Sequence, residues 1–133
     1  MGAAHQDLIA IDVLLVPDRA MIDKSISLNA QLRTNYPAGY ALDTTRIPHV
    51  TLLQRFVPAK DFEAVCAIIT NVLDNEPPTA MTLTATSIDS VKFERLAVAV
   101  LVVERTPKLV RLHQEITRGC TVLSSRRICG GIR

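Results

Sequence analysis

The sequence predicts an α+β fold in which an antiparallel or mixed sheet is backed by helices. Three observations support this: four segments of strand-like apolar residues, three segments with apolar residues at helical spacing, and proline, glycine or asparagine at the breaks between them. In chain order the segments read strand, helix, strand, helix, strand, strand, helix. With 133 residues, 48% of them apolar, the chain is expected to form one soluble folded unit.

The first strand is expected at residues 8–16, where a continuous run of largely branched apolar residues is typical of a central strand buried on both faces. Asp12 interrupts the run, and it either lies near a strand edge, pairs with a neighbouring base, or lies in a cleft. The first helix is expected to run from an N-cap at Asp18 to about Asn35 and to cover the sheet. Its apolar residues at helical spacing are Met21, Ile22, Ile26, Leu28 and Leu32.

The second strand is expected to begin at His49 and to end at Val57, with Pro48 at its entrance. Because side chains alternate faces along a strand, each face receives every second residue. One face is expected to carry His49, Thr51, Leu53 and Arg55, and the other Val50, Leu52, Gln54 and Phe56. Arg46, just before this strand, either approaches an anion or is an ordinary surface arginine.

The remaining elements follow from the same patterns. A second helix is expected at residues 59–73, with Cys66 as a small apolar member of its buried stripe. Two strands are expected at 81–91 and 96–104, joined by a hairpin turn. A third helix is expected after an N-cap at Thr106, with an apolar stripe formed by Leu109, Leu112 and Ile116.

Residues 117–133 differ in composition from the rest of the chain. They contain four arginines, no acidic residue, two of the three cysteines and three of the five glycines. No helical or strand period is expected through them, so the sequence predicts a lobe at residues 1–116 and a basic, atypical tail at 117–133. A non-native reading frame or a truncated product would account for this composition, and so would a short functional basic tail.

The bulk composition excludes several classes of function. A net charge of +2 gives no general case for nucleic-acid binding, and the three cysteines have neither the CxxC nor the Cys/His spacing of a zinc site. No apolar run reaches the roughly 20 residues of a membrane span, and the N-terminus lacks the basic start of a signal peptide. We therefore expect a cytoplasmic protein with no membrane partner.

The strand that begins at residue 49 opens with a His-x-Thr motif, Pro48-His49-Val50-Thr51-Leu52. This stretch resembles the first His-x-Thr motif of the 2H phosphoesterase superfamily, the group of 2′-5′ RNA ligase-like proteins and cyclic phosphodiesterases. In element order the resemblance extends over about residues 7–116. It implies a ferredoxin-like, 2H phosphoesterase-type lobe, followed by a second lobe that is incomplete in this sequence.

The resemblance also implies a chemistry. The substrate would be a phosphodiester at an RNA end or in a cyclic nucleotide, and no metal or other cofactor would take part. His49 would be a general acid or base and Thr51 a ligand of the phosphate, in a phosphodiesterase or RNA ligase reaction. The family pairs two such motifs, but neither His5 nor His113 begins a second one. We therefore expect activity to be absent or impaired by about 10²- to 10⁴-fold, unless a homodimer brings two copies of His49 together.

Three alternatives remain open. Taken without the resemblance, His49 and Thr51 are an ordinary strand-end histidine and a β-branched strand residue. A non-catalytic RNA-binding or interaction module is the second alternative, although no strand is expected to carry an aromatic platform, because Phe56 is assigned to the face opposite His49. An inactive fragment with unpaired strands is the third alternative.

His113 is expected on the third helix, and His5 in an untethered N-terminal segment.

Overall fold

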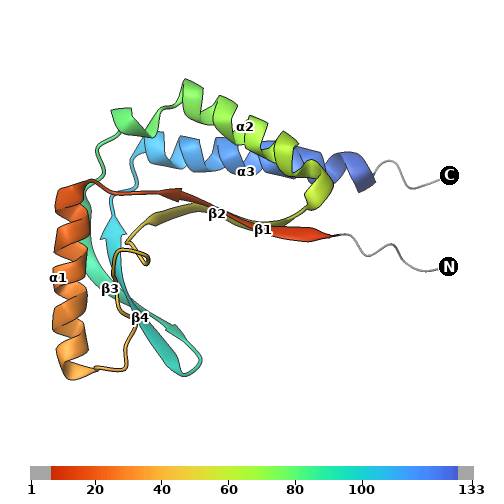
Figure 1. The fold of residues 1–133 in the computed structure, drawn as a ribbon. Helices are drawn as coiled ribbons and strands as arrows, with labels where there is room; N and C mark the ends of the chain where they lie inside the picture. The colour runs from red at the N-terminus through yellow and green to blue at the C-terminus, as the bar shows by residue number, and fades with distance from the viewer. Residues whose placement is uncertain (1–6, 129–133) are drawn as a thin grey trace, which may run out of the picture. The chain divides into compact units, whose positions relative to one another are not determined.

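The computed structural model describes the backbone of residues 7–128, together with the side chains of residues 7–92 and 94–121. Its elements confirm the predicted order and the α+β class (Figure 1). They are β1 (Leu8–Leu15), α1 (Arg19–Asn35), β2 (Val50–Pro58), α2 (Phe62–Asn75), β3 (Ala85–Phe93), β4 (Leu96–Val103) and α3 (Pro107–Ile128). Short 3-10 turns at Ala59–Asp61 and Pro78–Ala80 lead into and out of α2.

The chain divides into two compact units rather than the single unit expected from its length. The boundary lies between Ala59 and Lys60. The first unit contains the antiparallel pair β1 and β2, and the second contains the antiparallel pair β3 and β4. Each pair forms a separate two-stranded sheet, so the expected antiparallel pairing is found in both units.

Helix α1 begins as the sequence predicts but packs differently. The carboxylate of Asp18 accepts a hydrogen bond of 2.8 Å from the backbone N–H of Met21, which caps the helix. The helix runs crosswise to the ribbon formed by β1 and β2, and the pair is not among the closely packed elements (Figure 1). The expectation that α1 covers the sheet is therefore wrong for the β1–β2 ribbon. Between the end of β1 and the start of α1, the chain changes direction at Pro17, whose φ is fixed by its ring, and at the N-cap Asp18.

Strand β1 is more exposed than its apolar sequence suggests. Within residues 7–128 it pairs along one edge only, with β2, and the side chain of Leu8 is 57% exposed. A central strand buried on both faces needs a neighbour on each edge and a layer on each side. The two-stranded ribbon provides neither for the first half of β1, so the expected double burial is wrong.

A bulge in β2 changes which residues share a face. Val13 pairs with Leu53, but the next residue of β1, Leu14, pairs with Thr51, so Leu52 is an extra residue in β2. Leu52 is buried, and Leu53 beside it is half-buried. Regular alternation therefore stops at this point, and the predicted faces of β2 are wrong for the residues beyond Leu52.

Directly paired residues in an antiparallel ribbon have their side chains on the same face. Thr51 pairs with Leu14, and Gln54 pairs with Asp12, two residues along the regular strand β1. Thr51 and Gln54 consequently lie on one face, together with Phe56 opposite Ala10. We call this surface the Thr51 face; its residues are Thr51, Gln54 and Phe56 of β2 and Ala10, Asp12 and Leu14 of β1.

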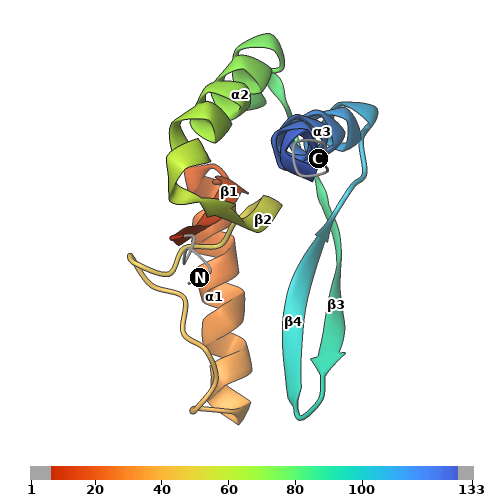
Figure 2. The ribbon, with the colours of Figure 1, turned by 90° about the vertical axis from the view of Figure 1, so that its right-hand side faces the viewer.

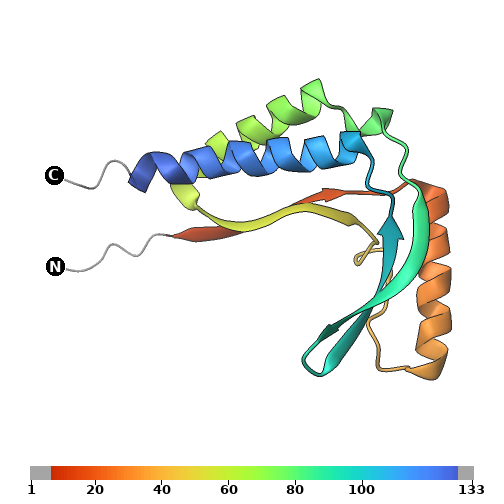
Figure 3. The same cartoon turned by 180° about the vertical axis from the view of Figure 1, so that it is seen from behind.

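The core of the second unit lies between α2 and α3, which run side by side in Figures 1 and 3. Val65 of α2 is buried, and so are four residues of α3 spaced at three or four positions: Leu109, Leu112, Ile116 and Cys120. Gly119 permits a close approach between the helices, because a Cβ atom at this position would lie 2.5 Å from Cγ2 of Ile68.

Helix α3 extends beyond Ile116, the last residue of its predicted apolar stripe. It continues from Ile116 to Ile128, and the buried stripe continues at least as far as Cys120. The expectation that no helical period passes through residues 117–128 is therefore wrong, and the boundary expected at residue 116 lies inside a helix. Residues 129–133, the rest of the expected tail, lie outside the described part of the chain.

Strands β3 and β4 form a twisted two-stranded ribbon (Figure 2). Phe93 pairs with Leu96, so Glu94 and Arg95 make a two-residue turn, and Glu94 adopts a φ of 49°. Ile88 and Leu96 are among its exposed apolar side chains. Over the described residues, no helix is both long enough and apolar enough to cross a membrane.

Candidate active site

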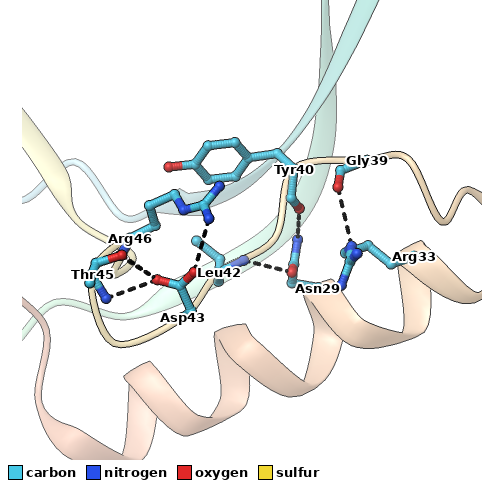
Figure 4. A network of polar contacts seen from close by, with 8 residues as sticks. All are labelled: Asn29, Arg33, Gly39, Tyr40, Leu42, Asp43, Thr45 and Arg46. Atoms are coloured by element: carbon cyan, nitrogen blue, oxygen red, sulfur yellow. Dashed lines mark hydrogen bonds and ion pairs between the residues drawn. The ribbon is translucent and has the colours of Figure 1, made fainter.

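The loop that leads from α1 to His49 is held by side chains of α1 (Figure 4). Asn29 donates through Nδ2 to the carbonyl oxygen of Tyr40 at 2.8 Å, and its Oδ1 accepts from the backbone N–H of Leu42 at 2.9 Å. Arg33 donates to the carbonyl oxygens of Gly39 and Pro37, each at 3.1 Å. These bonds attach an irregular segment to a regular helix and satisfy its backbone groups.

Asp43 organises the next part of the loop. One carboxylate oxygen accepts from the hydroxyl of Thr45 at 2.7 Å, from its backbone N–H at 2.8 Å, and from the backbone N–H of Arg46 at 2.9 Å (Figure 4). These bonds, those of Thr45 first, lower the pKa of Asp43 to about 2, and the positive charge of Arg46 adds to the effect. Asp43 is therefore a structural anion that keeps the turn before β2 closed.

Arg46 takes part in two contacts within the same loop. Its Nη2 lies 3.1 Å from Oδ2 of Asp43, and its guanidinium lies 5.5 Å from the centre of the Tyr40 ring. The sequence left a surface arginine and an anion-binding arginine open for this position. The structure shows a half-exposed side chain whose charge is already paired with Asp43.

His49 directly precedes β2, and its side chain is exposed. Nδ1 of the ring lies 2.9 Å from the carbonyl oxygen of Ile47. A carbonyl oxygen can only accept, so Nδ1 carries the proton in this contact. In the neutral ring Nε2 then has the free lone pair, which is the arrangement a general base requires.

Thr51 is the second residue of β2, and its side chain is also exposed. Thr51 lies two positions after His49, and side chains two positions apart project to the same side of an extended segment. Next along the Thr51 face, Nε2 of Gln54 donates to Oδ2 of Asp12 at 3.0 Å. Asp12 is thus exposed and bonded to the side-chain amide of Gln54. It neither pairs with a basic side chain in this bond nor lies buried in a cleft.

The other two histidines lie outside the sequence segment that carries His49 and Thr51. His113 lies on α3, in the second unit, where its side chain is exposed. His5 lies outside the described residues. His49, Thr51 and the loop that precedes them all belong to the first unit.

Comparison with protein families identifies the chain. The model of the 2′-5′ RNA ligase superfamily matches residues 25–127, more than half of the sequence. The chain belongs to the 2′-5′ RNA ligase superfamily. No curated protein and no solved structure matches it.

The match to the 2′-5′ RNA ligase superfamily begins within α1 and includes the loop, His49 and Thr51. It also includes residues 117–127, which the sequence analysis treated as part of an atypical tail, and which are helical in the structure. Membership implies RNA or another phosphodiester as the substrate. It confirms the resemblance stated for the His-x-Thr stretch.

The sequence predicted His49 and Thr51 as site residues but did not predict three structural features beside them. These are the bond from His49 to Ile47, the Asp43 turn, and the presence of Gln54 and Phe56 on the face of Thr51. The sequence did contain one signal of the bulge: Leu52 and Leu53 are consecutive apolar residues in a strand that otherwise alternates.

Proposed function

We propose that this protein acts on an RNA or nucleotide phosphodiester, either a 2′,3′-cyclic phosphate or a 2′-5′ linkage, by histidine acid-base chemistry. The observation that carries the proposal is the bond between His49 Nδ1 and the Ile47 carbonyl, found in a member of the 2′-5′ RNA ligase superfamily. This bond fixes the tautomer and the orientation of an exposed ring.

In this mechanism Nε2 of His49 acts as a general base that removes the proton from the attacking water or hydroxyl. In the reverse reaction the same nitrogen, now protonated, acts as a general acid and gives the proton to the leaving oxygen. The Nδ1–H bond to Ile47 supports the ring while the charge on it changes. The hydroxyl of Thr51 donates to a phosphoryl oxygen, where negative charge increases in the transition state. The reaction proposed uses no metal ion.

A complete acid-base pair needs a second proton-transfer group. The sequence contains a single His-x-Thr motif. We therefore propose that the turnover rate of the chain alone is about 10²- to 10⁴-fold lower than that of a site with both groups. A homodimer would supply a second copy of His49 across a twofold axis. Rates per protein molecule would then rise with protein concentration.

The test is hydrolysis of a short RNA that ends in a 2′,3′-cyclic phosphate, followed by separation of the ring-opened product. We expect measurable product with the wild-type chain and none with His49→Ala. His113→Ala serves as the matched control, because it removes an exposed histidine from the other unit. Equal rates for wild type and His49→Ala would overturn the catalytic assignment.

A second candidate is RNA binding without turnover. The exposed ring of Phe56 on the Thr51 face favours it, since aromatic side chains on a sheet surface can stack on bases. Titration with single-stranded RNA at several salt concentrations tests this candidate separately from hydrolysis. Absence of binding at low salt would exclude it.

A further inference from the structure

The backbone of Arg46, three residues before His49, is held on both sides by Asp43. The N–H of Arg46 donates to Oδ1 of Asp43 at 2.9 Å, and its carbonyl oxygen accepts from the backbone N–H of Asp43 at 3.2 Å. A peptide unit is planar, so the bond to the Arg46 carbonyl also fixes the N–H of Ile47, which lies in the same plane. The turn from Asp43 to Arg46 therefore sets the direction in which the chain enters Ile47.

Pro48 restricts the next step along the backbone. The residue before a proline is confined to an extended conformation, because the proline ring would clash with its backbone in the α region. Ile47 therefore has few backbone angles open to it once the plane between Arg46 and Ile47 is fixed. The carbonyl oxygen of Ile47 is held in one direction as a result, and it lies 2.9 Å from Nδ1 of His49.

We propose that Asp43 is a positioning residue for His49. Through the backbone of Arg46 and Ile47, it aims the Ile47 carbonyl at Nδ1 and so selects the tautomer in which Nε2 carries no hydrogen. The inference rests on the proposed function for the use of Nε2 as a base. It adds a residue outside the His-x-Thr motif that determines what fraction of the His49 rings is ready to accept a proton.

The ring of His49 needs such a device because a neutral imidazole has two tautomers. In free solution the ring favours the proton on Nε2, which leaves Nδ1 as the base. The side chain of His49 is exposed, so neighbouring side chains restrict the ring only in part. A hydrogen bond of ordinary net strength shifts an equilibrium between two forms by about 2- to 12-fold. The Ile47 carbonyl therefore moves the ring toward the Nδ1–H form.

The carboxylate of Asp43 is ionised throughout the pH range in which histidines ordinarily titrate. Its pKa is lowered to about 2, first by the hydroxyl of Thr45 and then by the backbone N–H of Thr45. Hydrogen bonds to an ionised acceptor are stronger than those between neutral groups, so the turn keeps its shape while His49 gains and loses a proton. Oδ1 of Asn29 accepts from the N–H of Leu42 at 2.9 Å, which connects the start of this turn to α1.

The experiment is nuclear magnetic resonance of the full chain, labelled with ¹⁵N in its histidine rings. The ring nitrogens of the two neutral tautomers differ in chemical shift, so spectra at about pH 9, where ordinary histidines are neutral, report the tautomer ratio. The signal of His49 is assigned by its absence from His49→Asn. We expect the Nδ1–H form to predominate in the wild type. Asp43→Ala should lower the ratio of Nδ1–H to Nε2–H by about 2- to 12-fold.

Two further variants act on the same backbone path. Asp43→Asn should restore most of the wild-type ratio, because its side-chain oxygen still accepts from the N–H of Arg46. Pro48→Ala should lower the ratio as Asp43→Ala does, because it frees the backbone of Ile47 without altering the turn. Should Asp43→Ala fail to fold, Pro48→Ala decides: a lowered ratio supports the path through Ile47, and an unchanged ratio overturns it.

Thr45→Val is the matched control. The hydroxyl of Thr45 donates to the same carboxylate at 2.7 Å (Figure 4), but it is not on the backbone path from Asp43 to Ile47. Its loss should lower the melting temperature and leave the tautomer ratio of His49 unchanged. An unchanged ratio in folded Asp43→Ala would overturn the proposal, since Asp43 would then act on stability alone. A wild-type ring in the Nε2–H form would also overturn it.

Hydrolysis of an RNA that ends in a 2′,3′-cyclic phosphate separates this proposal from the proposed function. Asp43→Ala should lower kcat in proportion to the Nδ1–H population and leave KM nearly unchanged, because fewer His49 rings can accept the proton. A tautomer ratio that depends on Asp43, without hydrolysis by any variant, would support the positioning and remove the catalytic role. Hydrolysis that depends on His49, with a tautomer ratio that ignores Asp43, would overturn the positioning and leave the function.

Discussion

Nδ1 of His49 lies 2.9 Å from the carbonyl oxygen of Ile47, which ties the ring to the chain two residues before it. An asparagine at this position keeps an N–H donor near Nδ1 but has no group in place of Nε2. We expect His49→Asn to retain the melting temperature of the wild type while hydrolysis of a 2′,3′-cyclic phosphate falls by about 10²- to 10⁴-fold. Thermal unfolding and product analysis measure the two effects. Wild-type hydrolysis by His49→Asn would mean that Nε2 transfers no proton.

Asp43 is expected to make the stability of the first unit depend on pH in the acid range. Its pKa is lowered to about 2 in the folded state, below the value of about 3.9 in an unfolded chain. The stabilisation is therefore complete above about pH 4 and is lost as the pH falls through about 2. Urea unfolding of wild type and Asp43→Asn should differ most near neutral pH, and the difference should shrink toward pH 2.

A suitable control for this titration is Asp23→Asn. Asp23 forms an exposed ion pair with Arg19 on the surface of α1, a type of contact that contributes little to stability. Its substitution should change the unfolding curves only slightly at each pH. A difference between wild type and Asp43→Asn that stays constant from neutral pH to pH 2 would contradict the role given to the Asp43 carboxylate.

Gly119→Ala is expected to destabilise the second unit. The added Cβ would lie 2.5 Å from Cγ2 of Ile68, well inside the normal separation of about 3.5–4.0 Å between carbon atoms. The expected cost of such overpacking is about 1–3 kcal/mol, which exceeds the gain of up to about 1 kcal/mol in helix propensity. Denaturant unfolding measures the net effect. In an Ile68→Ala background the substitution should become neutral or favourable; a stabilising effect in the wild-type background would refute the close contact.

Leu112 is expected to be among the costliest positions to truncate. Its side chain is 0% exposed in the core between α2 and α3, so Leu112→Ala should reduce the free energy of unfolding by about 2–5 kcal/mol. Leu32→Ala makes the same chemical change at a side chain that is 52% exposed, and should cost less than about 1 kcal/mol. Similar costs for the two variants in urea unfolding would show that the core is misassigned.

The order of elements could be predicted because each one has a clear local cause. Asp18 and Thr106 provide N-caps, and the helical stripes and apolar runs have different periods. The fold class follows from that order, and the structure confirms it. Local patterns do not fix how elements pack, which is why the crosswise position of α1 and the exposure of β1 were missed.

The length of α3 was missed for a compositional reason. Glycine and serine lowered the expected helix propensity beyond Ile116, yet Cys120 continues the spacing of Leu109, Leu112 and Ile116. Gly119 is favourable there because it lets α2 approach closely, a tertiary effect that propensity does not contain. The position of His49 at the entrance of β2 could be predicted, whereas the faces of β2 could not, because regular alternation was assumed.

The bulge at Leu52 gives this strand one residue more than its partner pairs with, so a single-residue deletion there is expected to keep the faces of the strand. Removing Leu52 or Leu53 would leave an unbroken two-residue period, and the strand could then pair regularly along its full length. Thr51 would then stand two positions before Gln54 and four before Phe56, so the three side chains would still share one face. A variant shortened by one leucine should therefore lose the bulge and yet present the His-x-Thr pair on the same side of the ribbon as the aromatic ring.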